Sequence, residues 1–215
     1  MSRRLLVLMA SAFAALCVAV SAGAHLAAPS QRVTIFARPT VVGWTEAALL
    51  YGTASGAGPQ DVVKVEMKEC GSTVYRAVVE AHVLSGGGWS APVAPSVTAT
   101  VRAVWKRTAS PSVTIRQEAW ITLERRRSGA GFVASVTSKR SLWRRVVEIQ
   151  RRSGSTWRTV KRVRLTDSVH STGSVSASEV SFALPVPPGT RLRAVLPSEQ
   201  ARPCYTRSVS RVVRT

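Results

Sequence analysis

The chain has 215 residues and carries 30 lysines and arginines against 11 aspartates and glutamates, a formal net charge of +19. This length accommodates two domains of ordinary size, and so positive a charge favours polyanions as partners. The three histidines stand alone in the sequence, with no two at metal-ligand spacing, which argues against a zinc site.

The first 24 residues have the order of parts found in a secretory signal peptide. Arg3 and Arg4 form a positive start, residues 5–20 are an apolar run, and residues 22–24 read Ala-Gly-Ala, a small-residue cleavage signal. We therefore predict that residues 1–24 are removed, with cleavage after Ala24. The mature protein is then expected to be secreted, either extracellular or associated with the cell envelope.

Two alternatives to a cleaved signal peptide are disfavoured. A retained membrane anchor would need about 20 apolar residues, more than this run offers, so we expect no transmembrane span after processing. A lipoprotein signal would use Cys17, but the residue before it is the bulky Leu16.

The residues after the signal are expected to form β-strands. Val, Ile, Thr and aromatic residues dominate short runs that clusters of Gly, Pro and Ser separate. In residues 62–67, Val63, Val65 and Met67 alternate with polar neighbours, the period of two that turns one face of a strand toward a core. The strands expected in the first half of the chain begin near residues 33, 49, 62, 75, 90, 98 and 112.

Four segments of the first half return, in the same order, later in the chain. The pairs are residues 33–35 with 113–115, 62–65 with 146–149, 71–73 with 154–156, and 101–104 with 192–195. Their offset grows from 80 to 91 residues, as it would in a duplicated fold with loop insertions. The mature chain is therefore predicted to be one β-rich pattern written twice.

The boundary between the two copies is predicted near Gln117. Residues 112–116 match residues 210–214, which close the second copy, and residues 120–123 then open a new strand. The predicted domains are residues 31–117 and residues 118–215. So short a connection leaves little linker, and we expect the domains to sit nearly end to end with restricted motion.

Two segments carry a resemblance to a known kind of module: the strand, turn and strand of residues 146–160, and the late segment of residues 188–195. They resemble secreted bacterial modules of the immunoglobulin-like or fibronectin type III-like class. The resemblance implies an all-β fold, with two tandem immunoglobulin-like β-sandwich domains after the signal peptide. It implies no particular activity, because such modules serve as spacers, adhesins and accessory domains of enzymes.

The mature chain has one cysteine in each copy, Cys70 and Cys204, so neither copy can hold the internal disulfide of antibody-type domains. In two sandwiches placed end to end, the turn that holds Cys70 faces the next domain, and the loop that holds Cys204 faces the same junction. We therefore expect an interdomain disulfide, in keeping with the oxidising destination of a secreted protein. Two free thiols or an intermolecular bridge are the alternatives.

The charge is unevenly divided between the predicted domains. Residues 31–117 hold nine basic and five acidic residues, a net charge of +4, whereas residues 118–215 hold 19 and six, a net charge of +13. The candidate basic binding face comprises Arg125, Arg126, Arg127, Arg144, Arg145, Arg151, Arg152, Arg158, Lys161, Arg162 and Arg164. Such a field would attract an anionic envelope polymer or glycan, without the base readout of a specific nucleic acid partner. The alternative is compositional: 25 of the 30 basic residues are arginines, as a GC-rich genome would give without selection for binding.

No catalytic, cofactor or metal site is predicted. Asp167 and His170, near Ser168 and Ser171, are the residue types of a hydrolytic triad. Such chemistry needs a rigid geometry, however, and residues 166–179 are interpreted as a solvated Ser-rich loop. The carboxylates are scattered, with no obvious pair for glycoside hydrolysis.

The six tryptophans leave a carbohydrate-stacking hypothesis open. Those interpreted as core residues are Trp89, Trp105, Trp143 and Trp157. The two expected to be exposed are Trp44 and Trp120, near the openings of the two copies.

The sequence as a whole predicts a non-catalytic secreted structural or binding protein. Two alternatives stay open: a secreted hydrolase with a loop-built active site, and an accessory or inhibitor subunit that binds another exported protein through a sheet edge. A cleft that gathers a base beside a nucleophile would favour the hydrolase. Retention by envelope material that salt releases would favour the binding protein.

Overall fold

The computed structural model describes residues 32–126, 131–170 and 175–215, with the backbone alone for residues 167–170. Strands dominate this part of the chain, and its one helix, α1 (Ser198–Ala201), has four residues. The all-β prediction is confirmed. The predicted signal peptide, residues 1–24, lies outside the described residues. No helix in the described ranges is long and apolar enough to cross a bilayer.

Residues 36–117 form two sheets. A three-stranded sheet has the order β1-β3-β6, and a six-stranded sheet has the order β2-β9-β7-β4-β5, with β8 paired to β7. The strands are β1 (Phe36–Arg38), β2 (Val41–Val42), β3 (Ala48–Thr53), β4 (Val62–Glu69), β5 (Arg76–His82), β6 (Gly88–Val93), β7 (Ala99–Trp105), β8 (Thr108–Ala109) and β9 (Val113–Gln117). The predicted alternation in β4 holds, because Val63 and Val65 are fully buried while Lys64 between them is exposed.

Residues 120–214 form two further sheets. One has the order β10-β11-β15-β14, and the other has the order β13-β12-β16-β17, with β18 also paired to β16. The strands are β10 (Trp120–Arg125), β11 (Gly131–Ser138), β12 (Val146–Ser153), β13 (Thr156–Arg164), β14 (Asp167–His170), β15 (Ser176–Ala183), β16 (Arg191–Leu196), β17 (Ser208–Val209) and β18 (Val213–Arg214).

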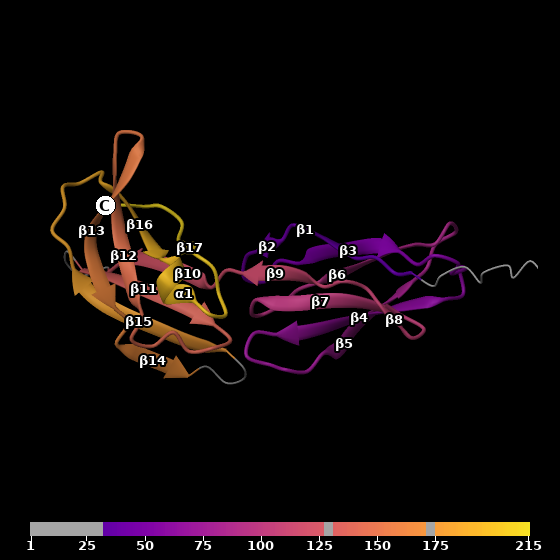
Figure 1. Cartoon of the computed structure of the whole chain (residues 1–215). Helices are drawn as coiled ribbons and strands as arrows, with labels where there is room; N and C mark the ends of the chain where they lie inside the picture. The colour runs from indigo at the N-terminus through magenta and orange to yellow at the C-terminus, as the bar shows by residue number, and fades with distance from the viewer. Residues whose placement is uncertain (1–31, 127–130, 171–174) are drawn as a thin grey trace, which may run out of the picture.

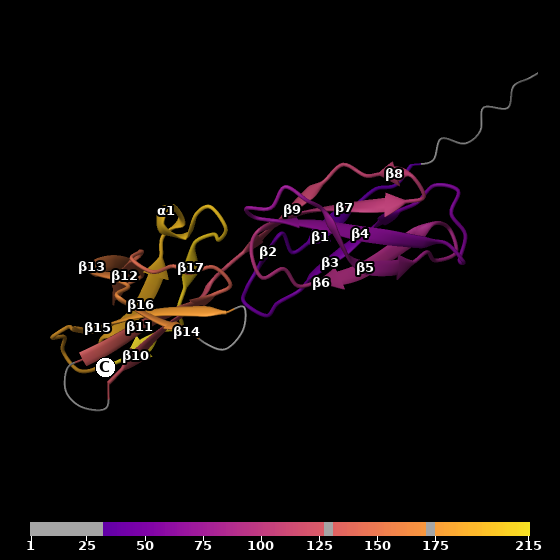
Figure 2. The same ribbon diagram turned by 90° about the horizontal axis from the view of Figure 1, so that it is seen from below.

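No described strand belongs to sheets of both sets, and each set of sheets encloses its own hydrophobic cluster. We call residues 32–117 the N-terminal half and residues 118–215 the C-terminal half. Figures 1 and 2 show the two halves lying end to end, with the chain passing between them after β9. Two side chains of the N-terminal half join the cluster of the C-terminal half: Val97, from the loop before β7, is buried in it, and Cys70 packs against it.

The two halves share the same central ladder. The order β5-β4-β7 in the N-terminal half corresponds to β13-β12-β16 in the C-terminal half, and the pairs are antiparallel in both. Each ladder has one bulge, and it leaves one residue unpaired, Val78 on β5 and Val160 on β13. Both valines are exposed, so the bulge turns an apolar side chain outward at the same place in each half.

Two of the segment pairs seen in the sequence do not correspond in space. Residues 33–35 open the N-terminal half, where Val33 makes only an isolated bridge to Ala54, whereas residues 113–117 are β9, which closes the same half. The match of residues 112–116 with residues 210–214 is out of register by two residues. Ser110, and not Ser112, makes the contacts that Ser210 makes.

Candidate functional site

The hairpin of β12 and β13 concentrates positive charge. Its strands are joined by a tight turn at Gly154, whose φ of 60° lies in the left-handed region that glycine adopts without strain. Arg151, Arg152 and Arg158 lie near this turn and are exposed. Val147 and Ile149, earlier in β12, fill the core. The arginines therefore occupy the end of the hairpin that extends past the core.

Two pairs of arginines face each other across neighbouring strands at this end of the sheet. Arg151 on β12 is opposite Arg158 on β13, and Arg191 on β16 is opposite Arg214 on β18. Like charges directly opposite each other destabilise a sheet. A bound anion would relieve that repulsion.

Arg151, Arg152 and Arg191 line a shallow recess of about 340 Å³. Its remaining lining residues are Gly154, Gly189 and Thr190, so none of the six carries a carboxylate. Within the recess, the Nε–H of Arg152 donates to the carbonyl of Gly154 at 3.0 Å, which holds that side chain across the turn. A guanidinium presents a planar fork of donors that matches phosphate, sulfate and carboxylate groups.

The acidic residue nearest in register to these arginines is already engaged. Glu148 forms an ion pair with Arg162 at 3.1 Å and accepts hydrogen bonds from Thr159 and Gln150. Burial by itself raises the pKa of Glu148, but these hydrogen bonds and the charge of Arg162 outweigh it and hold the pKa below 4.5. The negative charge of the Glu148 carboxylate is therefore already paired with the guanidinium of Arg162.

The other predicted basic residues do not join the recess. Arg144 and Arg145 precede β12 at its opposite end, and the Lys161 ammonium donates to the carbonyl of Ala183. Arg164 is paired with Val146, also far from the turn in register. Arg125 ends β10, in the other sheet, and Arg126 directly follows that strand, while Arg127 lies outside the described residues.

Arg191 is the recess residue that the sequence analysis left out. It lies 33 residues after Arg158 in the chain and reaches the site because Leu192 is paired with Arg151 across β12 and β16. In the sequence, Arg191 ends a Pro-Gly-Thr-Arg segment that leads into β16, and this segment contributes only to the fold resemblance.

The predicted bond between Cys70 and Cys204 is present. It joins residues 134 positions apart, with a Cα–Cα distance of 5.3 Å. Cys70 follows β4 and Cys204 follows α1, so the bond connects the two halves. The cystine packs against the cluster of the C-terminal half, in which Cys204 is buried.

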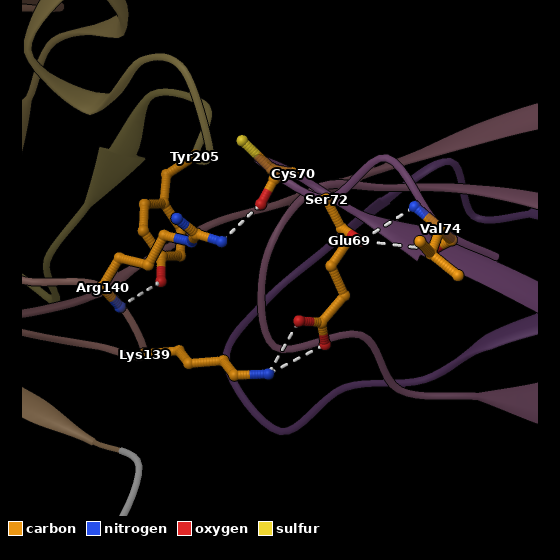
Figure 3. Close-up of polar contacts among 7 residues, drawn as sticks. All are labelled: Glu69, Cys70, Ser72, Val74, Lys139, Arg140 and Tyr205. Carbon is orange, nitrogen blue, oxygen red and sulfur yellow. Dashed lines mark hydrogen bonds and ion pairs between the residues drawn. The ribbon is translucent and has the colours of Figure 1, made fainter. Parts of the chain in front are cut away.

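Polar contacts surround the disulfide (Figure 3). The ammonium of Lys139 lies 2.8 Å from the carboxylate of Glu69, and the guanidinium of Arg140 donates to the carbonyl of Cys70 at 2.6 Å. The backbone N–H of Arg140 donates to the hydroxyl of Tyr205 at 3.1 Å. Burial raises the pKa of the Tyr205 hydroxyl, which therefore remains protonated at neutral pH.

Backbone hydrogen bonds also cross between the halves. The N–H of Thr98 donates to the carbonyl of Cys204, and the N–H of Thr206 donates to the carbonyl of Gln117. The side chain of Gln117 is fully buried, and its amide nitrogen donates to the carbonyls of Gly43 and Glu118 at 3.0 Å each. Gln117 thereby fixes the passage of the chain from one half to the other.

The segment considered for a hydrolytic triad is a strand. Residues 167–170 form β14, antiparallel to β15, which corrects the interpretation of a solvated loop. Ser171 lies outside the described residues, and only the backbone of His170 is described. In the described ranges, no group of three or more His, Cys, Asp or Glu side chains could hold a metal ion.

The tryptophans divide differently from the prediction. Trp89 and Trp105 are buried in the core of the N-terminal half, as expected. Trp143 is 45% exposed, under the guanidinium of Arg144, and Trp157 is half-buried beneath Arg193. These last two indoles stack on arginines at the surface and do not fill the core.

A comparison of the chain with known protein families found no family that matches it, and a search of the curated proteins found no related sequence. The candidate sites therefore rest on the geometry of this chain alone.

Proposed function

We propose that this protein is a non-catalytic secreted binding protein, built from two immunoglobulin-like β-sandwich modules, that binds an anionic polymer of the cell envelope through the arginine recess. The observation that carries the proposal is the recess itself, where Arg151, Arg152 and Arg191 converge without a carboxylate among the lining residues. The paired arginines on either side supply further positive charge that a repeating anionic chain can follow.

The junction between the halves supports the same function. A disulfide, an ion pair and three backbone hydrogen bonds connect the halves, so the recess is held in a fixed orientation relative to the N-terminal half. Rigid presentation lowers the conformational entropy lost on binding an extended polymer. Export is supported by the signal-like N-terminus and by a disulfide that persists in oxidising compartments.

The experiment measures binding of the secreted chain to long-chain polyphosphate and to poly(glycerol phosphate) at several salt concentrations. We expect affinity to fall steeply between about 50 mM and about 300 mM NaCl, because the attraction is screened and counterions are released. Replacing Arg151, Arg152 and Arg191 together with alanine should lower the affinity at least about tenfold and reduce the slope of log affinity against log salt by about two to three.

The matched control removes the same charge elsewhere. Arg38, Arg76 and Arg107 are exposed in the N-terminal half, and their triple alanine variant has the same net charge as the recess variant. If both triple variants lose affinity equally, the binding reflects net charge and the recess has no special role. Absence of binding by the unmodified protein at low salt would rule out the proposed function.

A further inference from the structure

A second hollow lies where the two halves meet, and it shares no residue with the arginine recess. It is an open groove of about 650 Å³ with Trp44 and Glu46 on one wall and Trp120 on the other. These two tryptophans, 76 positions apart in the chain, are the pair that the sequence analysis expected to be exposed. Trp120 is 55% exposed and Trp44 is half-buried. A groove of this size, with aromatic walls and a few polar groups, has the properties of a ligand site.

The strand β10 supplies one wall of the groove by simple alternation. Ile121 and Leu123 point into the core of the C-terminal half, so Trp120, Thr122 and Glu124 line the opposite, outward face. An indole, a hydroxyl and a carboxylate are thereby set in a row along one strand.

The opposite wall is a tight turn of residues 43–46, and it is held rigidly. The carboxylate of Glu46 accepts from the N–H of Gly43 at 2.8 Å, and the carbonyl of Gly43 accepts from the buried amide of Gln117 at 3.0 Å. Thr45 in this turn has a φ of 71°, a left-handed conformation that is costly for a β-branched residue. Such strain persists only where surrounding contacts enforce it, and here it fixes Trp44 and Glu46 at the edge of the groove.

The groove carries charges of both signs, with three carboxylates and one arginine among its lining residues. Glu46, Glu118 and Glu124 line it together with Arg211, and Arg207 acts electrostatically on Glu118. An anionic ligand would meet the three carboxylates, and a cationic one would meet Arg211 and the charge of Arg207 near Glu118. A neutral ligand rich in hydroxyl groups can use both, because hydroxyls donate to carboxylates and accept from guanidinium groups.

The state of Glu118 agrees with a ligand that donates hydrogen bonds. Burial, and then the charge of Glu46, raise the pKa of this carboxyl, while Arg207 lowers it in part. In the described part of the chain, Glu118 forms no ion pair within 4.0 Å. A sugar hydroxyl would therefore find an acceptor that is not already used.

We propose that this groove binds a neutral glycan chain, with a sugar ring stacked on the face of Trp120 and ring hydroxyls donating to Glu118 and Glu46. The indole covers the apolar face of a sugar ring, and the polar rim of the ring meets the carboxylates and Arg211. The site extends the protein's binding to an uncharged polymer and is independent of the arginine recess.

The test is isothermal titration calorimetry of the secreted chain, disulfide intact, with soluble neutral oligomers of glucose, mannose, galactose and N-acetylglucosamine. At least one oligomer should bind with a Kd of about 1 mM or tighter. Its affinity should change less than about twofold between about 50 mM and about 300 mM NaCl, because no net charge is neutralised. Failure of all four oligomers to bind overturns the proposal.

Variants locate the binding. Trp120→Ala should weaken the affinity about tenfold, and Glu118→Gln should weaken it about threefold, while Trp143→Ala, which removes an exposed indole outside the groove, should leave it unchanged. Both groove positions are solvent-accessible, so the variants should keep the circular dichroism of the native fold.

Three outcomes of the same titrations would overturn the neutral-glycan assignment. The first is glycan binding that survives Trp120→Ala unchanged. The second is binding of tetramethylammonium or lysine to the groove in place of the glycans. The third is binding of anionic oligomers only, with an affinity that salt abolishes. Such binding would occur at the arginine recess and not in the groove.

Discussion

At the scale of single residues, two glutamates differ in what their carboxylates meet. Glu118 is partly buried beside Glu46, and its pKa is raised, whereas Glu148 is surrounded by donors and its pKa is lowered. Both shifts are measured from the same ordinary value of 4.5. Ionisation of Glu118 therefore opposes folding, and ionisation of Glu148 favours it.

These opposite shifts predict opposite effects of glutamine substitution. Ionised Glu118 lowers the stability of the folded state. This loss is absent below pH 4.5 and grows as pH rises through the raised pKa of Glu118. At pH 7, Glu118→Gln should therefore increase the free energy of unfolding. Ionised Glu148 stabilises the folded state. This stabilisation is present above pH 4.5 and is lost as pH falls through the lowered pKa of Glu148. At pH 7, Glu148→Gln should therefore decrease the free energy of unfolding. Urea denaturation of both variants at pH 7 and at about pH 3 measures the two signs, and the differences from the unmodified protein should shrink at the lower pH. Equal signs at pH 7 would contradict the prediction.

At the scale of elements, each half closes its central ladder with the same serine contact. The N–H of Ala103 donates to the hydroxyl of Ser110 at 2.9 Å, and that hydroxyl donates to the carbonyl of Pro111. In the C-terminal half, the N–H of Ala194 donates to the hydroxyl of Ser210 at 2.8 Å in the same way. In each half, the serine hydroxyl accepts the hydrogen bond that a backbone carbonyl would accept in a regular sheet.

Removing this hydroxyl should destabilise the strand that it closes. Ser110→Ala would leave the buried N–H of Ala103 without its hydroxyl acceptor, at a cost of about 1–3 kcal/mol. Ser112→Ala is the matched control, because Ser112 is exposed and should tolerate the change within about 0.5 kcal/mol. Thermal and urea unfolding measure both. A larger loss of stability for Ser112→Ala than for Ser110→Ala would contradict the prediction and would favour Ser112 as the counterpart of Ser210.

Elements with a repeating pattern could be predicted from the sequence, and elements without one could not. The long strand β4 alternates over several residues, so its buried face could be predicted correctly. The short strands β2 and β8 have two residues each, too few to show a period, and they were missed.

The candidate sites could not be predicted in full, because they depend on the register of strand pairing and on contacts between segments far apart in the chain. The recess requires Arg191 to meet Arg151, and that meeting follows from the pairing of β16 with β12, which the sequence does not encode locally. The groove requires Trp44 and Trp120 to line the same hollow at the junction. Their places near the openings of the two copies predict exposure, which is observed for Trp120 while Trp44 is half-buried, but their proximity could not be predicted.

At the scale of the whole molecule, the disulfide is the covalent part of the junction. It could be predicted because each predicted domain has one mature cysteine and both lie at the same end-to-end contact. The polar contacts of Lys139 and Arg140 around it could not, since they depend on the path of the loop between β11 and β12.

Loss of this bond should lower the stability of the whole chain. In the chain-entropy model, closing a loop of 134 residues stabilises the folded state by about 5 kcal/mol, an upper figure because strain is not counted. The double variant Cys70→Ser and Cys204→Ser should therefore unfold at a lower urea concentration than the oxidised protein. The unmodified protein fully reduced by a thiol reagent is the control and should match the double variant. Identical unfolding of oxidised and reduced protein would contradict the prediction.

The same bond determines how the protein responds to a mechanical pull on its two ends. Tension applied along the backbone passes through the sulfur atoms and bypasses the stretch between Cys70 and Cys204, which lie 134 positions apart. As extended chain, that stretch would add about 450 Å of contour length, which stays unavailable while the bond is intact. While the bond is intact, only the residues before Cys70 and after Cys204 can lengthen under load, and reduction would release the stretch between them as a long elastic tether.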